Sequence, residues 1–136
     1  MFLKEHILTG AVAAGVVGWY VSPQAGISVL AGSVLIDVDH YLWYTVKFKD
    51  NSLGRATHFF EAKEADHYYC LCVLHTVEVI AVYIAGVLFM HGAIFWISAG
   101  CLMHMALDVA QGILDGGLFR RKWSLIHAIF FRARGG

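Results

Sequence analysis

The sequence places acidic and histidine side chains at or inside long apolar stretches, a setting in which ionisable groups are costly. Nine residues share it: His6, Asp37, Asp39, His40, His67, His75, Glu78, His104 and Asp108. An ionisable residue surrounded by hydrocarbon marks a functional site by default. The first hypothesis is therefore a metal site embedded in a membrane.

Most of these residues belong to short motifs that have the spacing of metal ligands. The motifs are Asp37-Val-Asp39-His40, His75-Thr-Val-Glu78 and His104-Met-Ala-Leu-Asp108. Residues three or four apart share one face of a helix, so we expect each of the last two motifs to present an imidazole together with a carboxylate. Helix bundles build interior metal sites from such groups on facing helices.

The donor set indicates which cations would fit. Its four carboxylates carry four negative charges when ionised, which two divalent cations would balance: Asp37, Asp39, Glu78 and Asp108. Without cations, neighbouring carboxylates in a low dielectric must protonate or repel one another. Mixed oxygen and nitrogen donors suit zinc, manganese or iron better than magnesium or calcium. We expect one or two divalent ions, zinc first; the alternative is a purely structural polar network.

The cysteines do not enter this prediction. Cys70, Cys72 and Cys101 lie in apolar stretches, are odd in number and lack the paired spacing of zinc-binding cysteines. We interpret them as packing or membrane-facing residues, with neither a disulfide nor a thiolate ligand.

The composition indicates an integral membrane protein. Of the 136 residues, 59% are hydrophobic and only 15% are charged, against about 25% charged in a soluble domain. A domain of this size leaves much of its surface exposed and could not bury so many apolar side chains. The formal net charge is zero, so nothing suggests a nucleic acid as partner.

Four apolar segments are the candidate spans, since a helix needs about 20 residues to cross a bilayer. They cover residues 7–21, 25–36 with a continuation to 44, 69–89, and 93 to about 114. Ser22-Pro23-Gln24 and His91-Gly92 are predicted turns, which makes two helical hairpins. The predicted fold is all-α: an integral membrane four-helix bundle over residues 1–116.

Residues 117–136 form a predicted amphipathic and basic cytoplasmic tail. Between Leu118 and Phe131 this tail mixes basic residues with large apolar ones. That pattern favours a helix lying in the membrane interface over a fifth span.

The positive charges predict the orientation. All ten Lys and Arg residues lie outside the two short turns, so four spans place them on one side, which the positive-inside rule makes cytoplasmic. We expect a multi-pass protein of the inner (cytoplasmic) membrane with both termini in the cytoplasm. The ligand-type side chains then gather at one level, beneath the cytoplasmic lipid surface.

The order of the motifs resembles the YdjM-like membrane-bound metal-dependent hydrolases, described as LexA-regulated inner-membrane hydrolases. The resemblance spans most of residues 1–115 and rests on His6-Ile-Leu-Thr-Gly10, Ile36-Asp37-Val-Asp39-His40, His75-Thr76 and His104-Met-Ala-Leu-Asp108. This chain departs from the family pattern in three ways. Its His-Arg-Gly-x-x-His element is not intact, Ile36 replaces a common Pro, and Glu78 is additional. Kinship with helical zinc phospholipases C is also implied.

The resemblance implies a metal-dependent hydrolase acting on a phosphate ester or lipid-type substrate at the cytoplasmic leaflet. The predicted metal ligands are His6, Asp37, Asp39, His40, His75, Glu78, His104 and Asp108, with His6 and His40 as ligands or orienting residues. Glu78 and Asp39 are the catalytic candidates, Glu78 as ligand or general base. Possible additional ligands are His67 and His58.

Basic residues near the site could hold an anionic headgroup, although ordinary positive-inside anchoring also accounts for them. The candidates are Arg55, Lys63, Arg120 and Arg121. Membrane lipid is the expected partner, and glycines such as Gly10 and Gly32 would permit close helix packing or a homo-oligomer.

Two other functions stay open. One is a non-catalytic metal-binding membrane protein, such as a structural or sensor subunit of a complex. A metal transporter is a weaker option, because the outer half of the predicted bundle is apolar. Hydrolysis that a chelator abolishes would separate the enzyme from both.

Overall fold

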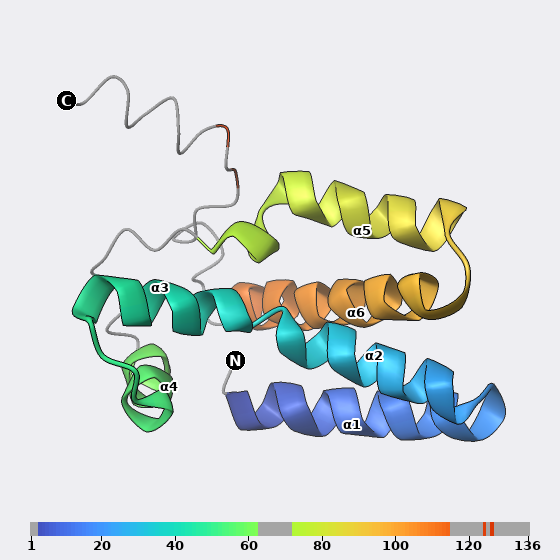
Figure 1. Ribbon diagram of the computed structural model, residues 1–136, viewed down its shortest axis with the longest axis horizontal. Helices are drawn as coiled ribbons and strands as arrows, with labels where there is room; N and C mark the ends of the chain where they lie inside the picture. Colours follow the sequence, from blue (N-terminus) through green and yellow to red (C-terminus); the bar gives the residue numbers. More distant parts are fainter. Residues whose placement is uncertain (1–2, 63–71, 115–123, 125, 127–136) are drawn as a thin grey trace.

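The computed structural model describes residues 3–62, 72–114, 124 and 126, and these residues form helices and turns without a strand (Figure 1). The elements in chain order are α1 (Leu3–Tyr20), α2 (Pro23–Leu35), α3 (Val38–Phe48), α4 (Leu53–Glu61), the short 3-10 helix η2 (Val73–His75), α5 (Val77–Phe89) and α6 (Gly92–Leu114). The prediction of an all-α chain is confirmed for this part of the protein.

Both predicted hairpins form. Ser22 caps α2, since its hydroxyl accepts a hydrogen bond from the amide of Ala25 at 3.2 Å, and Pro23 follows at the first helical position, where no amide hydrogen is needed. At the other turn Gly92 has a φ of +63°, a conformation that glycine adopts without strain. These turns pair α1 with α2 and α5 with α6.

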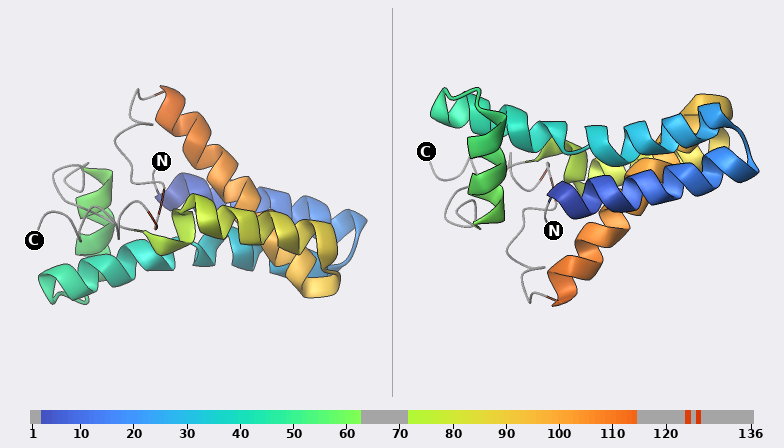
Figure 2. Two further views of the ribbon diagram at one scale, coloured as in Figure 1. Left: turned by 90° about the horizontal axis from the view of Figure 1, so that it is seen from above. Right: turned by 90° about the horizontal axis from the view of Figure 1, so that it is seen from below.

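The four apolar helices lie in a row rather than around a square. Helix α2 packs against α1 on one side and α6 on the other, and α6 also packs against α5. Figure 2 shows the far end of α6 turning away from its neighbours. The two central helices, α2 and α6, therefore determine how the rest is positioned.

Glycines allow the backbones of α2 and α6 to touch. A Cβ atom at Gly32 would overlap the carbonyl oxygen of Ile97, and one at Gly100 would overlap the carbonyl oxygen of Val29. Only glycine fits at such reciprocal contacts, which are typical of closely packed membrane helices. The contact fixes the register of the two helices and brings His104, one turn after Gly100, against α2.

The second apolar segment, predicted over residues 25–36 with a continuation to 44, is helical on both sides of an interruption at Ile36 and Asp37. The amide of Asp37 bonds to the carbonyl of Val34 at 3.3 Å, and the amide of His40 bonds to the carbonyl of Asp37 at 3.1 Å. These three-residue spacings tighten the chain between α2 and α3. Asp37 stands at the N-cap position of α3 but makes no capping hydrogen bond, so its carboxylate is available to the site.

The predicted start of the helix in the third segment was wrong, as far as the described residues show. The segment was expected to be helical from Tyr69, but α5 begins only at Val77, after η2 and an extended Thr76. The amide of Leu74 donates a hydrogen bond to the Asp39 carboxylate at 2.8 Å, a tertiary contact that holds the chain out of a continuous α-helix. His75 and Glu78 consequently do not share a helix face, contrary to the prediction.

Between the predicted second and third segments the chain forms the helical hairpin α3–α4. Its core is an aromatic cluster around Tyr44, Ala56 and Phe59. Arg55 closes the hairpin by a two-pronged ion pair with Asp50, with N–O distances of 2.6 and 2.7 Å. The predicted interfacial helix of the tail lies almost entirely outside the described residues.

Two helical stretches are long and apolar enough to cross a membrane: Pro23–Phe48, which joins α2 to α3, and Gly92–Leu114. The apolar parts of α1 and α5 are shorter. Large apolar side chains are exposed along the row, including Trp19 at 84%, Leu88 at 66% and Phe89 at 73%. Exposed apolar surface of this extent indicates an apolar environment or partner.

We expect Gly100→Ala to destabilise the protein. The added methyl group must push the backbones of α6 and α2 apart, and overpacking of this kind costs about 1–3 kcal/mol. Thermal unfolding in detergent measures the effect. Gly15→Ala is the matched control, because a Cβ there meets nothing within 4 Å; equal melting temperatures for the two variants would contradict the helix contact.

Candidate metal centre

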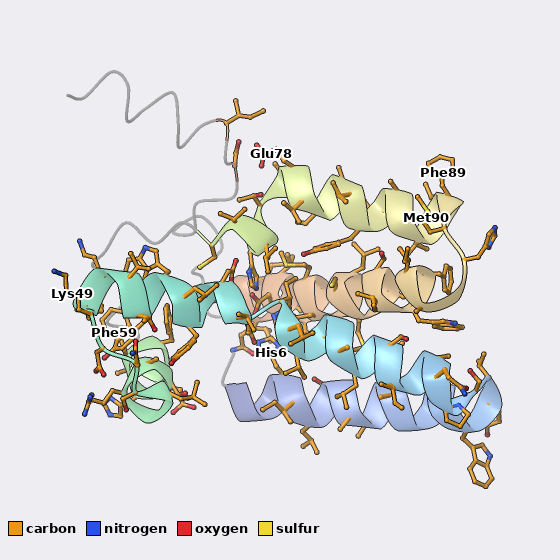
Figure 3. All side chains as sticks on the ribbon, in the orientation of Figure 1. His6, Lys49, Phe59, Glu78, Phe89 and Met90 are labelled. Carbon is orange, nitrogen blue, oxygen red and sulfur yellow. The ribbon has the colours of Figure 1, made fainter. Side chains whose placement is uncertain are left out.

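Ligand-type side chains from separate elements meet at the end of the row opposite the two short turns. They come from the start of α1 (His6), the α2–α3 junction (Asp37), η2 (His75), and α6 (His104 and Asp108). Figure 3 shows His6 at this end, where the helices converge. Four of these side chains are at most 7% exposed, and Asp37 is 20% exposed. The convergence predicted for these five residues is present.

The Asp37 carboxylate lies among three imidazoles. Its Oδ1 atom is 3.4 Å from Nε2 of His104, 3.5 Å from Nδ1 of His40 and 3.6 Å from Nε2 of His75. These distances exceed those of good N–H···O hydrogen bonds. Ligand atoms of one tetrahedral zinc ion lie about 3.3–3.4 Å apart, given metal–ligand bonds of about 2.0–2.1 Å. The spacing therefore suits donors that surround a cation.

A second carboxylate, Asp108 on α6, faces His75 and also the imidazole of His6. Its Oδ1 atom is 3.2 Å from Nε2 of His6, and its Oδ2 atom is 3.9 Å from Nε2 of His75. The rings of His6 and His104 stack with their centroids 4.0 Å apart. The imidazoles thus lie between two acidic side chains, which offset any positive charge held there.

Three groups that share members each have ligand atoms within 4.8 Å of one another and could each hold a metal ion. The groups are His6/Asp37/His104, Asp37/His40/His75 and His75/His104/Asp108. Because Asp37, His75 and His104 each belong to two groups, the cluster could accommodate more than one ion. We call these six residues the Asp37 centre.

Several nitrogens of the centre fit a cation better than they fit their protein surroundings. Nε2 of His75, Nε2 of His104 and Nδ1 of His6 are buried and have no hydrogen-bond partner among the described residues. Leaving a buried polar atom unsatisfied costs about 1–3 kcal/mol. Imidazole nitrogens and carboxylate oxygens are ligands of divalent transition metals, so bound cations would satisfy these atoms.

Hydrogen bonds orient two of the imidazoles. Nδ1 of His104 donates to the carbonyl oxygen of Ser33 at 2.7 Å, and Nδ1 of His75 donates to the Asp39 carboxylate at 3.3 Å. In a neutral imidazole this leaves Nε2 as the lone-pair atom, and in both residues Nε2 faces Asp37. Metal-binding histidines are oriented in this way by carbonyl or carboxylate partners.

Asp39 holds the site together from α3. Its Oδ2 atom accepts the hydrogen bonds of the Leu74 amide and His75, while Oδ1 lies 3.0 Å from Nδ1 of His40. These contacts favour a positioning role for Asp39. Its predicted roles as ligand and catalytic residue stay predictions.

Glu78 lies apart from the Asp37 centre. Its Oε1 atom accepts hydrogen bonds from the Ser124 hydroxyl at 2.7 Å and the Ile126 amide at 3.2 Å. Glu78 belongs to none of the ligand groups found among the described residues, and Figure 3 shows it at the start of α5. The extended conformation of Thr76 separates it from His75, so the geometry does not favour Glu78 as ligand or general base.

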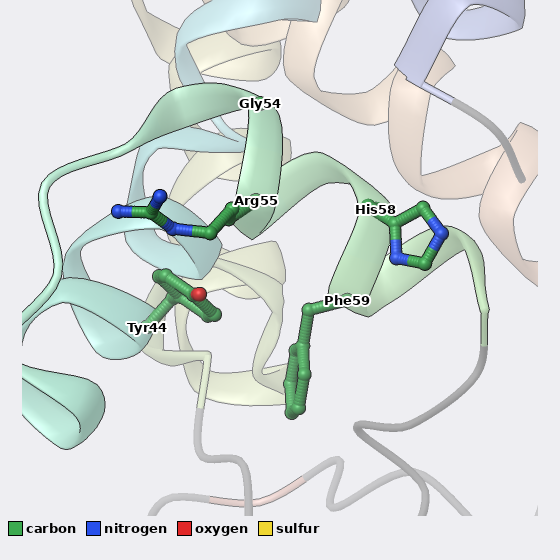
Figure 4. A pocket seen from close by; sticks show the side chains of 5 residues that line it. All are labelled: Tyr44, Gly54, Arg55, His58 and Phe59. Carbon is green, nitrogen blue, oxygen red and sulfur yellow. The ribbon is translucent and has the colours of Figure 1, made fainter.

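The remaining predicted residues do not join the centre within the described part of the chain. His58 is exposed on α4 and lines a pocket with Tyr44, Gly54, Arg55 and Phe59 (Figure 4). Arg55 is engaged by Asp50, and its hydrogen bonds hold the pKa of that carboxyl well below its usual range, so its guanidinium is not free for an anionic substrate. Outside the described residues lie His67, Lys63, Arg120 and Arg121.

Cys72 is the residue that the sequence interpretation missed. It is buried, and its thiol lies within 4.8 Å of ligand atoms from Asp39 and His40. The available signal was its spacing to His75, Cys72-Val-Leu-His75. With that spacing, a cysteine and a histidine, both residue types that bind metals, lie on one tight turn.

Comparisons with known proteins leave the chain without an assigned family: no family model, no curated protein and no solved structure matches it. The resemblance to the YdjM-like hydrolases therefore rests on the motifs alone.

We expect Asp37→Asn to lose bound metal, because the change removes the charge from the carboxylate that three imidazoles surround. The affinity should fall by more than the 10–100-fold caused by loss of an orienting partner. Elemental analysis of detergent-purified protein, followed by competition with a chelator, measures this. Asp50→Asn removes an equal charge from the α3–α4 hairpin and should leave metal content unchanged; the same content in both variants would refute the Asp37 centre.

Proposed function

We propose that this protein is a membrane-embedded metal-dependent hydrolase that acts on a phosphate ester or lipid-type substrate at the cytoplasmic leaflet. One observation carries the proposal: imidazoles and carboxylates from α1, the α2–α3 junction, η2 and α6, all buried except the partly exposed Asp37, converge at ligand spacing. Keeping so many ionisable groups together in an apolar chain is costly. Selection for a metal centre accounts for that cost.

The membrane part of the proposal rests on composition and on the distribution of charge. Two helical stretches are long enough to span, and large apolar side chains are exposed along all four apolar helices. The two short turns carry no Lys or Arg, whereas Lys47, Lys49 and Arg55 lie beyond the site in the α3–α4 hairpin. The positive-inside rule then orients the metal centre toward the cytoplasm, close to the lipid headgroups.

The proposed ligands are the side chains of the Asp37 centre, and zinc is the favoured ion. When bound, a divalent cation supplies Lewis acidity and lowers the pKa of water toward about 7. Ser33 and Asp39 orient His104 and His75 so that Nε2 of each faces Asp37, where these atoms would hold the ion. A phosphate ester would approach the centre at its more exposed edge, which Asp37 and His40 form. The buried residues of α6 exclude bulk water from the opposite side.

Membership in the YdjM-like family is part of the same proposal. Residues from each of the motifs that carry the resemblance meet in space: His6, Asp37, His75, His104 and Asp108. A set of short motifs that were unrelated to a common site would have no reason to converge from four elements.

A non-catalytic metal-binding membrane protein is the second candidate. It is favoured by the burial of the α6 ligands, with the His104 side chain 1% and the Asp108 side chain 4% exposed. Structural metal sites are closed, whereas catalytic sites keep an open position. Metal that stays bound while no substrate is hydrolysed would favour this function.

We expect the purified zinc-loaded protein to hydrolyse a chromogenic phosphate ester or labelled phospholipid, and a chelator to abolish the reaction. His104→Ala should lower the rate by at least 100-fold, because the variant lacks a proposed ligand and should no longer bind the metal ion. Release of product is the measurement, with Asp50→Asn as the active control. Activity that survives both the chelator and His104→Ala would rule out the proposed hydrolase.

The topology makes a separate prediction. A cysteine introduced by Met90→Cys, at the turn before α6, should react with a membrane-impermeant maleimide in intact cells. A cysteine introduced by Lys49→Cys should react only after the membrane is permeabilised. The unsubstituted chain measures background labelling of the native cysteines, and equal labelling of both positions in intact cells would contradict the orientation.

A further inference from the structure

The turn that carries Cys72 is tied to the first turn of α3. In η2 the His75 amide bonds to the Cys72 carbonyl at 3.2 Å, which places both side chains on a single tight turn. The Leu74 amide bonds to Asp39 at 2.8 Å and docks this turn onto α3. Cys72 is thereby held beside Asp39 and His40, while His75 reaches the Asp37 centre.

We propose that Asp39, His40 and Cys72 form a second metal subsite, which binds zinc or another thiophilic divalent cation. Their ligand atoms lie within 4.8 Å of one another, and the thiol is buried. The subsite deepens the proposed function, because it adjoins the Asp37 centre through His40. It differs from that centre in having a sulfur ligand.

The chemistry of the three ligands supports this assignment. A carboxylate, an imidazole and a thiolate are all zinc ligands, and thiolate favours zinc over manganese or magnesium. One thiolate and one carboxylate also balance a divalent charge, so an occupied subsite is neutral in its buried setting. The Asp39 and His40 side chains are 12% and 23% exposed, which places the subsite nearer the surface than the α6 ligands.

Cys101 shows what a packing cysteine looks like in the same protein. Its thiol donates to the Gly32 carbonyl at 3.3 Å, and it lies in the apolar cluster with Ile36 and Met105. Cys101 belongs to none of the ligand groups found among the described residues. It is as buried as Cys72, and is therefore a matched control.

Cobalt substitution tests the subsite without relying on activity. The detergent-purified protein loaded with Co²⁺ should show sulfur-to-cobalt charge-transfer absorption in the near ultraviolet, and excess Zn²⁺ should remove it. Cys72→Ser should abolish this absorption and lower the metal content by one ion per chain. Cys101→Ser and Cys70→Ser should retain both; circular dichroism checks that each variant is folded.

The wild-type protein provides a second measurement that does not depend on folding of a variant. Cd²⁺ should slow alkylation of Cys72 at least tenfold, read by mass spectrometry, and leave Cys101 unaffected. Absence of the charge-transfer absorption in the wild type, its persistence in Cys72→Ser, or unprotected Cys72 would each overturn the subsite. Those results would leave the proposed function intact if Asp37→Asn still loses metal and activity.

Discussion

The whole arrangement depends on the electrostatic problem of burying carboxylates and imidazoles at one end of an apolar row of helices. Asp37 Oδ1 has three imidazole nitrogens at 3.4–3.6 Å, too far for strong hydrogen bonds and suitable for shared coordination. A buried charge without a partner is severely destabilising, whereas the charge of a carboxylate that binds a cation is balanced by that cation. Metal binding would therefore contribute directly to the stability of the fold.

The scaffold meets this demand through backbone contact rather than through bulky side chains. Gly32 and Gly100 let α2 and α6 touch, and the same contact brings Ser33 within 2.7 Å of His104. Packing of the two helices therefore also orients the His104 imidazole, because the carbonyl that accepts its hydrogen bond belongs to Ser33, the residue next to Gly32. A shift between these helices would disturb both.

The two breaks in helical structure serve the site in a similar way. At Asp37 the tight junction of α2 and α3 leaves the carboxylate without a capping role. At Thr76 the extended residue directs His75 inward and leaves Glu78 with Ser124 and Ile126. Regular helices through both positions would have spread these side chains around two helix surfaces.

Much of this protein was predictable from its sequence alone. The apolar segments, the turns at Pro23 and Gly92, and the shared helix face of His104 and Asp108 follow from local pattern, because hydropathy and helical periodicity act over neighbouring residues. The tertiary structure decided which residues of the third segment face the site. Asp39 accepts a hydrogen bond from the Leu74 amide, 35 positions away. This contact turns His75 toward Asp37 and leaves Glu78 apart from the centre, and a local pattern does not encode a contact between residues so far apart in the chain.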